Sequence, residues 1–238
     1  MLDRVLVGAA VALRSSPRVY AVHLALSGRL KPGLLPSSDT ALHVTGYPRS
    51  GNTFAAGVLS RVFPSVSMVT HVHAIASIKL ARKHEIPTIV LVRDPQDAIA
   101  SWALRSSPTR WRSDTLLSAA LEYTAYHRFV LDMIDELFVL RFSQLTETPS
   151  VLLSAVHAVL PSLPIEIAES DFHSVATQVV EHLRSDTRPA GQNCWQSEEK
   201  EALKAEIRKR LGTLPEYVDA RARYEGILAK RNPVEPWW

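Results

Sequence analysis

The sequence is poor in cysteine: Cys194 is the only one among 238 residues. No internal disulfide can form, which excludes the small disulfide-stapled folds. Structural zinc sites built from cysteine pairs are excluded for the same reason. A chain with 46% hydrophobic and 21% charged residues suits one compact domain, because a disordered chain would be poorer in apolar side chains.

Long apolar runs are also missing. The run Val5–Leu13 has nine residues and is closed by Arg14–Pro17, whereas a membrane-spanning helix needs ~20. No clear small-x-small cleavage site follows, which disfavours a signal peptide. We interpret this run as an amphipathic helix that packs on the domain, with contact to a membrane surface as the alternative. A cytoplasmic protein without a transmembrane segment is expected.

A large excess of charge of one sign is absent as well. The formal net charge is +3, which is compatible with an anionic ligand. It is smaller than the positive charge expected of a dedicated nucleic-acid-binding protein. We therefore expect no nucleic-acid partner.

The pattern along the chain divides it into a helical extension, residues 1–40, and an α/β domain, residues 41–238. From residue 41 onward, short apolar runs alternate with helical stretches, which is typical of βα units and a parallel sheet with helices on both faces. Strands are predicted at 41–45, 66–71, 87–92 and 138–142. Helices are predicted at 5–13, 19–30, 53–62, 74–84, 95–102, 113–137, 198–211 and 217–231, within a mostly helical remainder after Thr148.

The most informative segment is residues 46–53, G-Y-P-R-S-G-N-T. Its glycines and final Thr53 have the spacing of a phosphate-binding P-loop between a strand and a helix. Glycine permits close backbone approach, and a helix N-terminus attracts an anion. The lysine that works on nucleoside triphosphates is replaced by Asn52, so triphosphate chemistry is disfavoured. A plain turn is the alternative.

Residues 47–54, Y-P-R-S-G-N-T-F, resemble the Y-P-K-S-G-T-T-W signature of sulfotransferases that use 3′-phosphoadenosine 5′-phosphosulfate (PAPS). The resemblance implies a three-layer P-loop-type sulfotransferase fold with a parallel sheet. It also implies that this loop holds the 5′-phosphate end of the donor and that Phe54 stacks on adenine. The residues carried over to the phosphate are Arg49, Ser50, Gly51, Asn52 and Thr53.

A second segment, residues 93–101, follows the strongest predicted strand and is similar to the family's R-[ND]-P-x-D-x-x-x-S motif. The resemblance implies that Arg93 and Ser101 bind the 3′-phosphate. An arginine fork matches phosphate oxygens in pairs. Two alternatives stay open: an ion pair of Arg93 with Asp94 or Asp97, and a magnesium ligand at Asp94.

Two further positions are implied by the resemblance alone. Arg188, in R-P-A-G-Q-N-C-W, matches the arginine of the family's R-K-G-x-x-G-x-W stretch and would contact the 3′-phosphate, although the lysine and first glycine of that stretch are replaced. A polar turn is the alternative there. Phe142 is expected to end the last strand at the position of a tyrosine that lies beside adenine.

The residues 70–73, T-H-V-H, resemble the family's K-T-H segment, which implies that His71 is the general base. Histidine suits proton removal because its ordinary pKa lies near neutrality. Arg49 would stabilise charge on the leaving phosphate. Val69 replaces the segment's lysine, which removes one cation. His73 is predicted to point to the same side of a strand as His71. We expect it to line the acceptor pocket or to make a plain hydrogen bond, and a metal site is the less favoured interpretation.

We therefore predict a sulfotransferase that moves a sulfo group from PAPS to an acceptor hydroxyl or amine, releasing 3′,5′-ADP and requiring no metal. Its partners would be a small-molecule or carbohydrate acceptor and, in a homodimer, a second copy. The alternatives are a magnesium-dependent P-loop kinase or NTPase, and a non-catalytic nucleotide-binding protein with the same fold.

Overall fold

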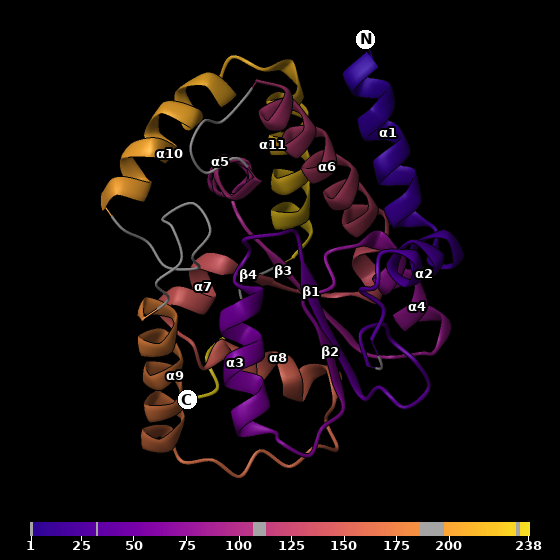
Figure 1. The fold of residues 1–238 in the computed structure, drawn as a ribbon. Helices are drawn as coiled ribbons and strands as arrows, with labels where there is room; N and C mark the ends of the chain where they lie inside the picture. The colour runs from indigo at the N-terminus through magenta and orange to yellow at the C-terminus, as the bar shows by residue number, and fades with distance from the viewer. Residues whose placement is uncertain (1, 32, 107–112, 186–197, 232–233) are drawn as a thin grey trace.

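The architecture is a parallel α/β sandwich of three layers, seen in a computed structural model (Figure 1). The structure describes residues 2–31, 33–106, 113–185, 198–231 and 234–238. Its four-stranded sheet has the order β2-β1-β3-β4, and every pairing between neighbours is parallel. The strands are β1 (Leu42–Gly46), β2 (Met68–Thr70), β3 (Thr88–Val92) and β4 (Phe138–Arg141).

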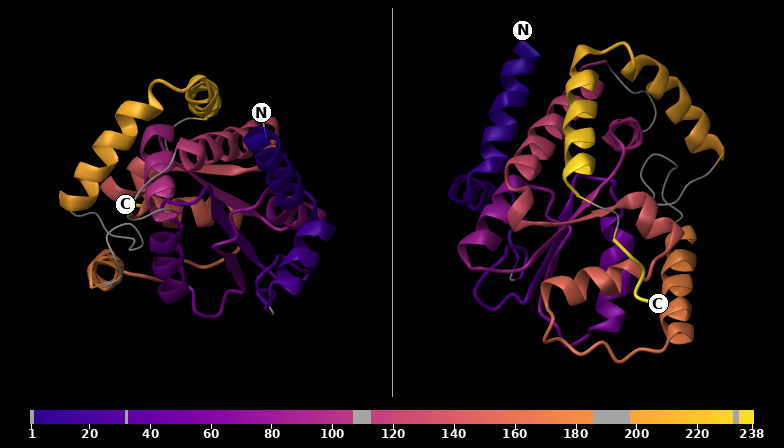
Figure 2. Two further views of the ribbon diagram at one scale, coloured as in Figure 1. Left: turned by 45° about the horizontal axis from the view of Figure 1, so that its top comes forward. Right: turned by 180° about the vertical axis from the view of Figure 1, so that it is seen from behind.

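Helices surround this sheet (Figures 1 and 2). Those before β3 are α1 (Leu2–Ser15), α2 (Pro17–Leu26), α3 (Asn52–Val62) and α4 (Ile75–Lys83). Those after β3 are α5 (Pro95–Ser106), α6 (Ser113–Asp132), α7 (Phe142–Glu147), α8 (Val151–Val159), α9 (Glu169–Arg184), α10 (Glu198–Leu211) and α11 (Pro215–Lys230). None of the described helices is both long and apolar enough to cross a membrane.

Both faces of the sheet are covered, which explains the continuously apolar sequence of β3. Val90 and Val92 belong to one buried cluster with residues of α5, α6 and α11. Ile89 and Leu91 point the other way, into a second cluster with α3, α8 and α9. Successive strand residues alternate between faces, so a strand buried on both sides has no polar face. The predicted parallel sheet with helices on both faces is confirmed.

Several predicted boundaries differ from the structure, and two of them flank β4. The helix predicted at 113–137 ends at Asp132, and a short 3-10 turn (Ile134–Glu136) follows; there Ile134 enters the core while its carbonyl accepts a hydrogen bond from Arg231. Phe142 does not end β4 but begins α7. Local apolar sequence favours continuing the strand, whereas the side-chain oxygen of Gln144 accepts from the Arg141 N–H (3.4 Å) and favours a helix start.

The two N-terminal helices pack on the outside of the sandwich. α1 lies along α6, and α2 lies against α4, at the right-hand side of Figure 1. Arg14 joins α1 to α6 through an ion pair with Glu122 (2.8 Å). Leu24, on the inner side of α2, is buried. The division of the chain into an extension and a domain at residue 40 stays a prediction.

Candidate functional site

The sheet topology gathers the predicted site residues at one edge. Gly46, Thr70, Val92 and Arg141 are the last residues of the four strands, and parallel strands end at a common edge. The segments with the predicted site residues begin at that edge, immediately after β1, β2, β3 and β4. In open parallel sheets, ligands bind outside the carboxyl ends of the strands.

The loop from Gly46 to Asn52 joins β1 to α3, and its backbone needs glycine at both ends. A Cβ on Gly46 would collide with the carbonyl oxygen of Leu91 in the neighbouring strand. Gly51 has φ +92°, and a Cβ there would lie 2.9 Å from side-chain carbons of Phe142 and Leu145. Arg49 also has a positive φ, 73°. The chain thus turns sharply between β1 and α3 at the edge of the sheet.

Side chains of the loop anchor it to the core. The Tyr47 hydroxyl donates to the carbonyl of Ala119 on α6 (2.9 Å). The amide nitrogen of Asn52 donates back to the carbonyl of Tyr47 (3.2 Å), which closes the turn from inside. Asn52 is therefore a buried residue that stabilises the loop through this hydrogen bond, and its side chain supplies no positive charge.

Ser50 stands out because its hydroxyl is buried without a hydrogen-bond partner. The residue is 0% exposed. A buried polar atom that lacks a partner costs roughly 1–3 kcal/mol, so such atoms are uncommon in folded proteins. The side-chain oxygen of Asn52 is in the same condition. Two unsatisfied polar atoms in one loop fit a site whose hydrogen bonds are completed by a ligand.

The two predicted anion-binding segments lie in direct contact. The Arg49 Nε donates to the Ser101 hydroxyl (2.9 Å). The Arg93 guanidinium donates to the carbonyl of Arg49 (2.9 Å). Residues 52 positions apart in the sequence are therefore joined by a hydrogen bond at the sheet edge. Ser101 on α5 orients Arg49, and the loop carbonyl of Arg49 orients Arg93.

Arg93 is buried and contacts several protein groups, while its Nε has no hydrogen-bond partner. Only 7% of the residue is exposed, and its guanidinium lies 4.1 Å from the ring centre of Phe142. An ion pair joins it to Asp97 (3.4 Å), so that alternative from the sequence is present in the structure. The Tyr123 hydroxyl donates to its carbonyl (2.6 Å). Burial lowers the pKa of Arg93, while Asp97 opposes that shift.

Helix α10 adds a group of cations that the sequence patterns did not indicate. Arg208 forms an ion pair with Asp97 (2.6 Å) and a second with Glu201 (3.1 Å). Lys204, whose side chain is fully buried, also pairs with Glu201 (2.5 Å). Burial disfavours ionisation of Asp97, but the charges of Arg93 and Arg208 outweigh it and lower its pKa. Arg93, Lys204 and Arg208 thus belong to one ion-pair network with Asp97 and Glu201.

β2 ends at Thr70, and His71 follows it with a positive φ of 64°, so the prediction that His71 and His73 lie on one side of an extended strand is wrong. The Nε2 of His71 is 3.4 Å from the Thr53 hydroxyl at the end of the loop. Its Nδ1 is 3.0 Å from the Thr70 hydroxyl. The side chain is exposed, and partial desolvation lowers its pKa from 6.5. The imidazole is thus neutral at physiological pH and able to accept a proton.

His73 is fixed in a different way. Its Nδ1 lies 2.8 Å from the carbonyl of Gly46, and because a carbonyl only accepts, Nδ1 carries the proton. Burial lowers the pKa of His73 to about 4. It lines a small cavity between α1 and α6, and its ring centre is 6.4 Å from that of His71. No cluster of three potential metal-ligating residues occurs among the described residues.

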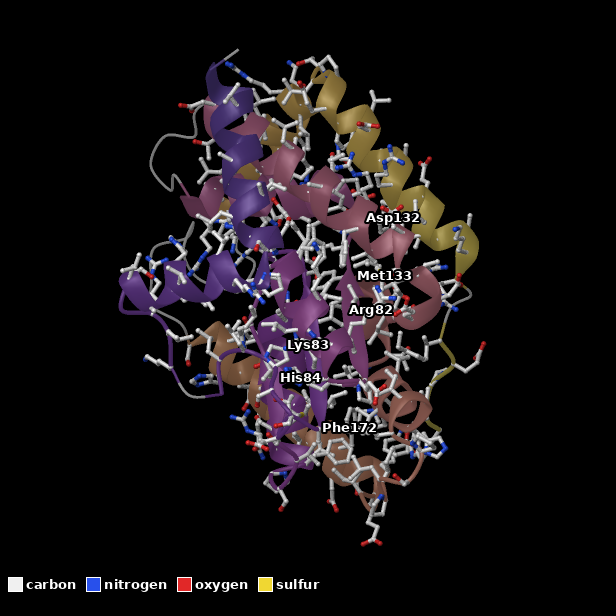
Figure 3. The ribbon with its side chains drawn as sticks, turned by 90° about the vertical axis from the view of Figure 1, so that its right-hand side faces the viewer. Arg82, Lys83, His84, Asp132, Met133 and Phe172 are labelled. Carbon is white, nitrogen blue, oxygen red and sulfur yellow. The ribbon has the colours of Figure 1, made fainter. Side chains whose placement is uncertain are left out.

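The aromatic candidates lie in different surroundings. Phe142 packs on Gly51 and on Arg93, inside the site. Phe54 packs on the apolar cluster that α3 forms with α8 and α9. Phe172 on α9 is fully buried in that cluster, 5.7 Å from the Trp238 ring (Figure 3). Arg188 lies outside the described residues.

Together, the fold and the carboxyl edge of the sheet define a parallel α/β protein with a basic strand-to-helix loop after β1.

No family model and no curated protein sequence matches the chain. Among solved structures, a crystal structure of mouse sulfotransferase SULT7A1 complexed with PAP resembles it, with a TM-score of 0.48 and 11% sequence identity. The match covers 83% of this chain and 86% of that one.

Proposed function

We propose that this chain is a sulfotransferase that transfers the sulfo group of PAPS to a hydroxyl or amine of an acceptor. The observation that carries the proposal is the convergence of Arg49, Ser101 and Arg93 on the loop after β1. Convergent cations, backbone amides and a helix N-terminus suit a ligand with two separate phosphate groups. The motifs at residues 47–54 and 93–101 give that ligand its proposed identity.

The described residues fit such a donor. The unpartnered hydroxyl of Ser50 and the unpartnered Nε of Arg93 are polar groups that a bound anion would satisfy. The loop from Arg49 to Thr53 would hold the 5′-phosphosulfate end, and Arg93 with Ser101 would hold the 3′-phosphate, where Arg188 remains a further candidate. Phe54 and Phe142 are proposed for the adenine. When bound, the donor supplies an activated sulfo group with phosphate as its leaving group.

His71 is proposed as the general base. The position of its Nε2 near Thr53 puts the imidazole beside the end of the loop that would hold the phosphosulfate. A neutral imidazole there can take the proton of an acceptor hydroxyl as its oxygen forms the new bond to sulfur. Arg49, always protonated, stabilises the negative charge that develops on the phosphate oxygen. His73 donates to Gly46 and positions the start of the loop.

A magnesium-dependent kinase is supported less well by the same residues. The position of the catalytic lysine is filled by Asn52, whose amide is used inside the loop. Asp94, the candidate magnesium ligand, accepts a hydrogen bond from the Gln96 N–H (2.8 Å) at the start of α5. The remaining alternative, a non-catalytic nucleotide-binding protein, differs from our proposal only in turnover.

Ligand-dependent melting separates these functions. We expect 3′,5′-ADP to raise the melting temperature without Mg²⁺, and Mg²⁺–ATP to have no such effect, because only a bound ligand stabilises the folded state. The reverse pattern would favour the kinase. Stabilisation by 3′,5′-ADP with no transfer of labelled sulfate to any of a broad panel of acceptors would favour the non-catalytic protein.

The pH profile tests the base. Because the pKa of His71 lies below 6.5, we expect a constant rate above about that pH and a falling rate as acid protonates the imidazole. His71→Ala should lower turnover by roughly 10²–10⁴-fold, the usual contribution of a general base. The matched control is His173→Ala, an exposed histidine on α9, which should leave the rate unchanged. Undiminished activity in His71→Ala would eliminate His71 as the base.

A further inference from the structure

Helix α2 carries a stripe of apolar side chains that the rest of the chain leaves exposed. Val19, Val22 and Leu26 are spaced three and four residues apart, so they lie on one face of the helix. Val22 is 58% exposed and Leu26 is 84% exposed. Leu30, just beyond the helix, is exposed as well. Val5 on α1 adds another exposed apolar side chain.

The opposite side of α2 is firmly packed, so the exposed stripe belongs to a docked helix. Leu24 is buried, and Tyr20 packs on a small apolar cluster that includes Val69, Val72 and Ala76. α2 also contacts α4. The helix thus has two apolar faces, one used inside the protein and one directed outward.

The charge of this part of the chain is strongly asymmetric. Residues 4–84 contain ten lysines and arginines but a single acidic residue, Asp39, a surplus of nine in a chain whose total is +3. Arg18, Arg29 and Lys31 are exposed on or next to α2. The cations continue onto the neighbouring helix α4 and the residues that follow it.

Figure 3 shows that continuation on the side of the molecule that also carries α2. Lys83 and His84 are exposed there. Arg82 lies beside Met133, 3.8 Å from its sulfur, and pairs with Glu136. Glu85, which follows them, and Asp132, labelled near Met133 in Figure 3, are exposed and acidic, so the basic area ends at the turn after α4 and at the end of α6.

We infer that the α2 face, defined as Arg18, Val19, Val22, Leu26, Arg29, Leu30 and Lys31, binds the surface of a bilayer that contains anionic lipids. Apolar side chains flanked by cations on a helix that lies along the surface are suited to the headgroup region, where the apolar atoms enter and the cations meet lipid phosphates. A nucleic acid would use the cations and leave the apolar stripe in water. This inference does not depend on the proposed sulfotransferase activity.

The test is sedimentation of the full chain with vesicles of phosphatidylcholine, with and without about 30% phosphatidylserine. We expect binding to the anionic vesicles that weakens with added salt. Arg18→Glu with Arg29→Glu should reduce the partition coefficient by about 25-fold or more, since each cation near the surface contributes about five-fold. Val22→Ser with Leu26→Ser should reduce it by about ten-fold or more.

The matched control is Val218→Ser on α11, which removes an equally exposed apolar side chain (68%) from a different helix. It should bind vesicles like the parent, and all variants should melt at the parent temperature because the substituted positions are exposed. Equal binding by the parent and both double variants would overturn the inference. So would a dimer that Leu26→Ser disrupts, or tight binding of labelled RNA, in a protein that does not sediment with anionic vesicles.

Discussion

Replacing Arg93 by lysine tests the centre of the proposed donor site. The substitution keeps a positive charge but removes the planar fork. In the structure that fork donates to the Arg49 carbonyl (2.9 Å) and pairs with Asp97 (3.4 Å). A lysine reaches one of these groups at a time. Losing one or two net hydrogen bonds costs about 1–2 kcal/mol, which for a chain of this size lowers the melting temperature by roughly 2–8 °C.

The effect on ligand affinity should be larger than the effect on stability. If Arg93 binds the 3′-phosphate with both nitrogens, Arg93→Lys should weaken binding of 3′,5′-ADP by about 10–100-fold, as expected for hydrogen bonds to a charged group. Isothermal titration calorimetry measures the affinity, and thermal melting of the same sample measures the stability. Arg221→Lys is the control, because Arg221 forms an exposed pair with Glu225 (2.9 Å) on α11, and such pairs contribute little.

The two measurements separate two roles of Arg93. A lower melting temperature with unchanged affinity would mean that Arg93 serves only its ion pair with Asp97, and the proposed 3′-phosphate site would be refuted at this residue. Unchanged stability and affinity together would contradict the hydrogen bonds on which the reasoning depends.

Three other predictions concern the loop and the core. Ser50→Ala should leave the free protein as stable as the parent or slightly more stable, because it removes a buried hydroxyl that has no hydrogen-bond partner. The same substitution should reduce the increase in melting temperature that 3′,5′-ADP produces. A large loss of stability would contradict the unsatisfied state of that hydroxyl. Gly51→Ala should lower the free energy of unfolding in urea by about 1–2 kcal/mol or more, because the φ of Gly51 is +92°. The control is Gly8→Ala, which should not lower it, because the space around Gly8 is open. Burial lowers the pKa values of His43 and His127 to about 3, from 6.5 in the unfolded chain. The folded state therefore keeps both side chains neutral, and protonation favours the unfolded state. Acidification from about pH 7 to pH 5 should therefore cost about 2 kcal/mol of unfolding free energy per histidine, and a flat profile over that range would show that they are not buried.

The sequence predicts the strand-to-helix loop well because the glycine spacing and the strand before it are visible in consecutive residues. The reasons for the two glycines are only partly local: Gly51 has a positive φ, whereas Gly46 is required by the close approach of Leu91 in the neighbouring strand. The burial of β3 on both of its faces could also be predicted, because its consecutive residues are all apolar. The sheet order is fixed by the connections between βα units, and the predicted parallel arrangement is correct.

Phe142 shows where local reasoning fails. Its apolar sequence context continues the strand, but the chain turns into α7 at that residue. The turn depends on contacts with partners distant in the chain, since the ring packs against Gly51 and Arg93. Gln144, which caps the helix start, is a local signal for this turn, but the packing partners of Phe142 lie 49 and 91 positions away and cannot be inferred from its neighbours.

The cations of α10 illustrate the same limit at the scale of the site. Lys200, Lys204 and Arg208 are spaced four residues apart, so one face of the helix is basic, and in an isolated sequence such a face is most simply solvated. Only the packing of α10 on α5 brings Arg208 to Asp97 and buries Lys204. Burying a charge is costly unless another charge compensates it. The ion pairs of Lys204 with Glu201 and of Arg208 with Asp97 supply such compensation. Because these pairs form only when the fold brings α10 against α5, the sequence of α10 alone does not reveal that its basic face lies next to Arg93 and Asp97.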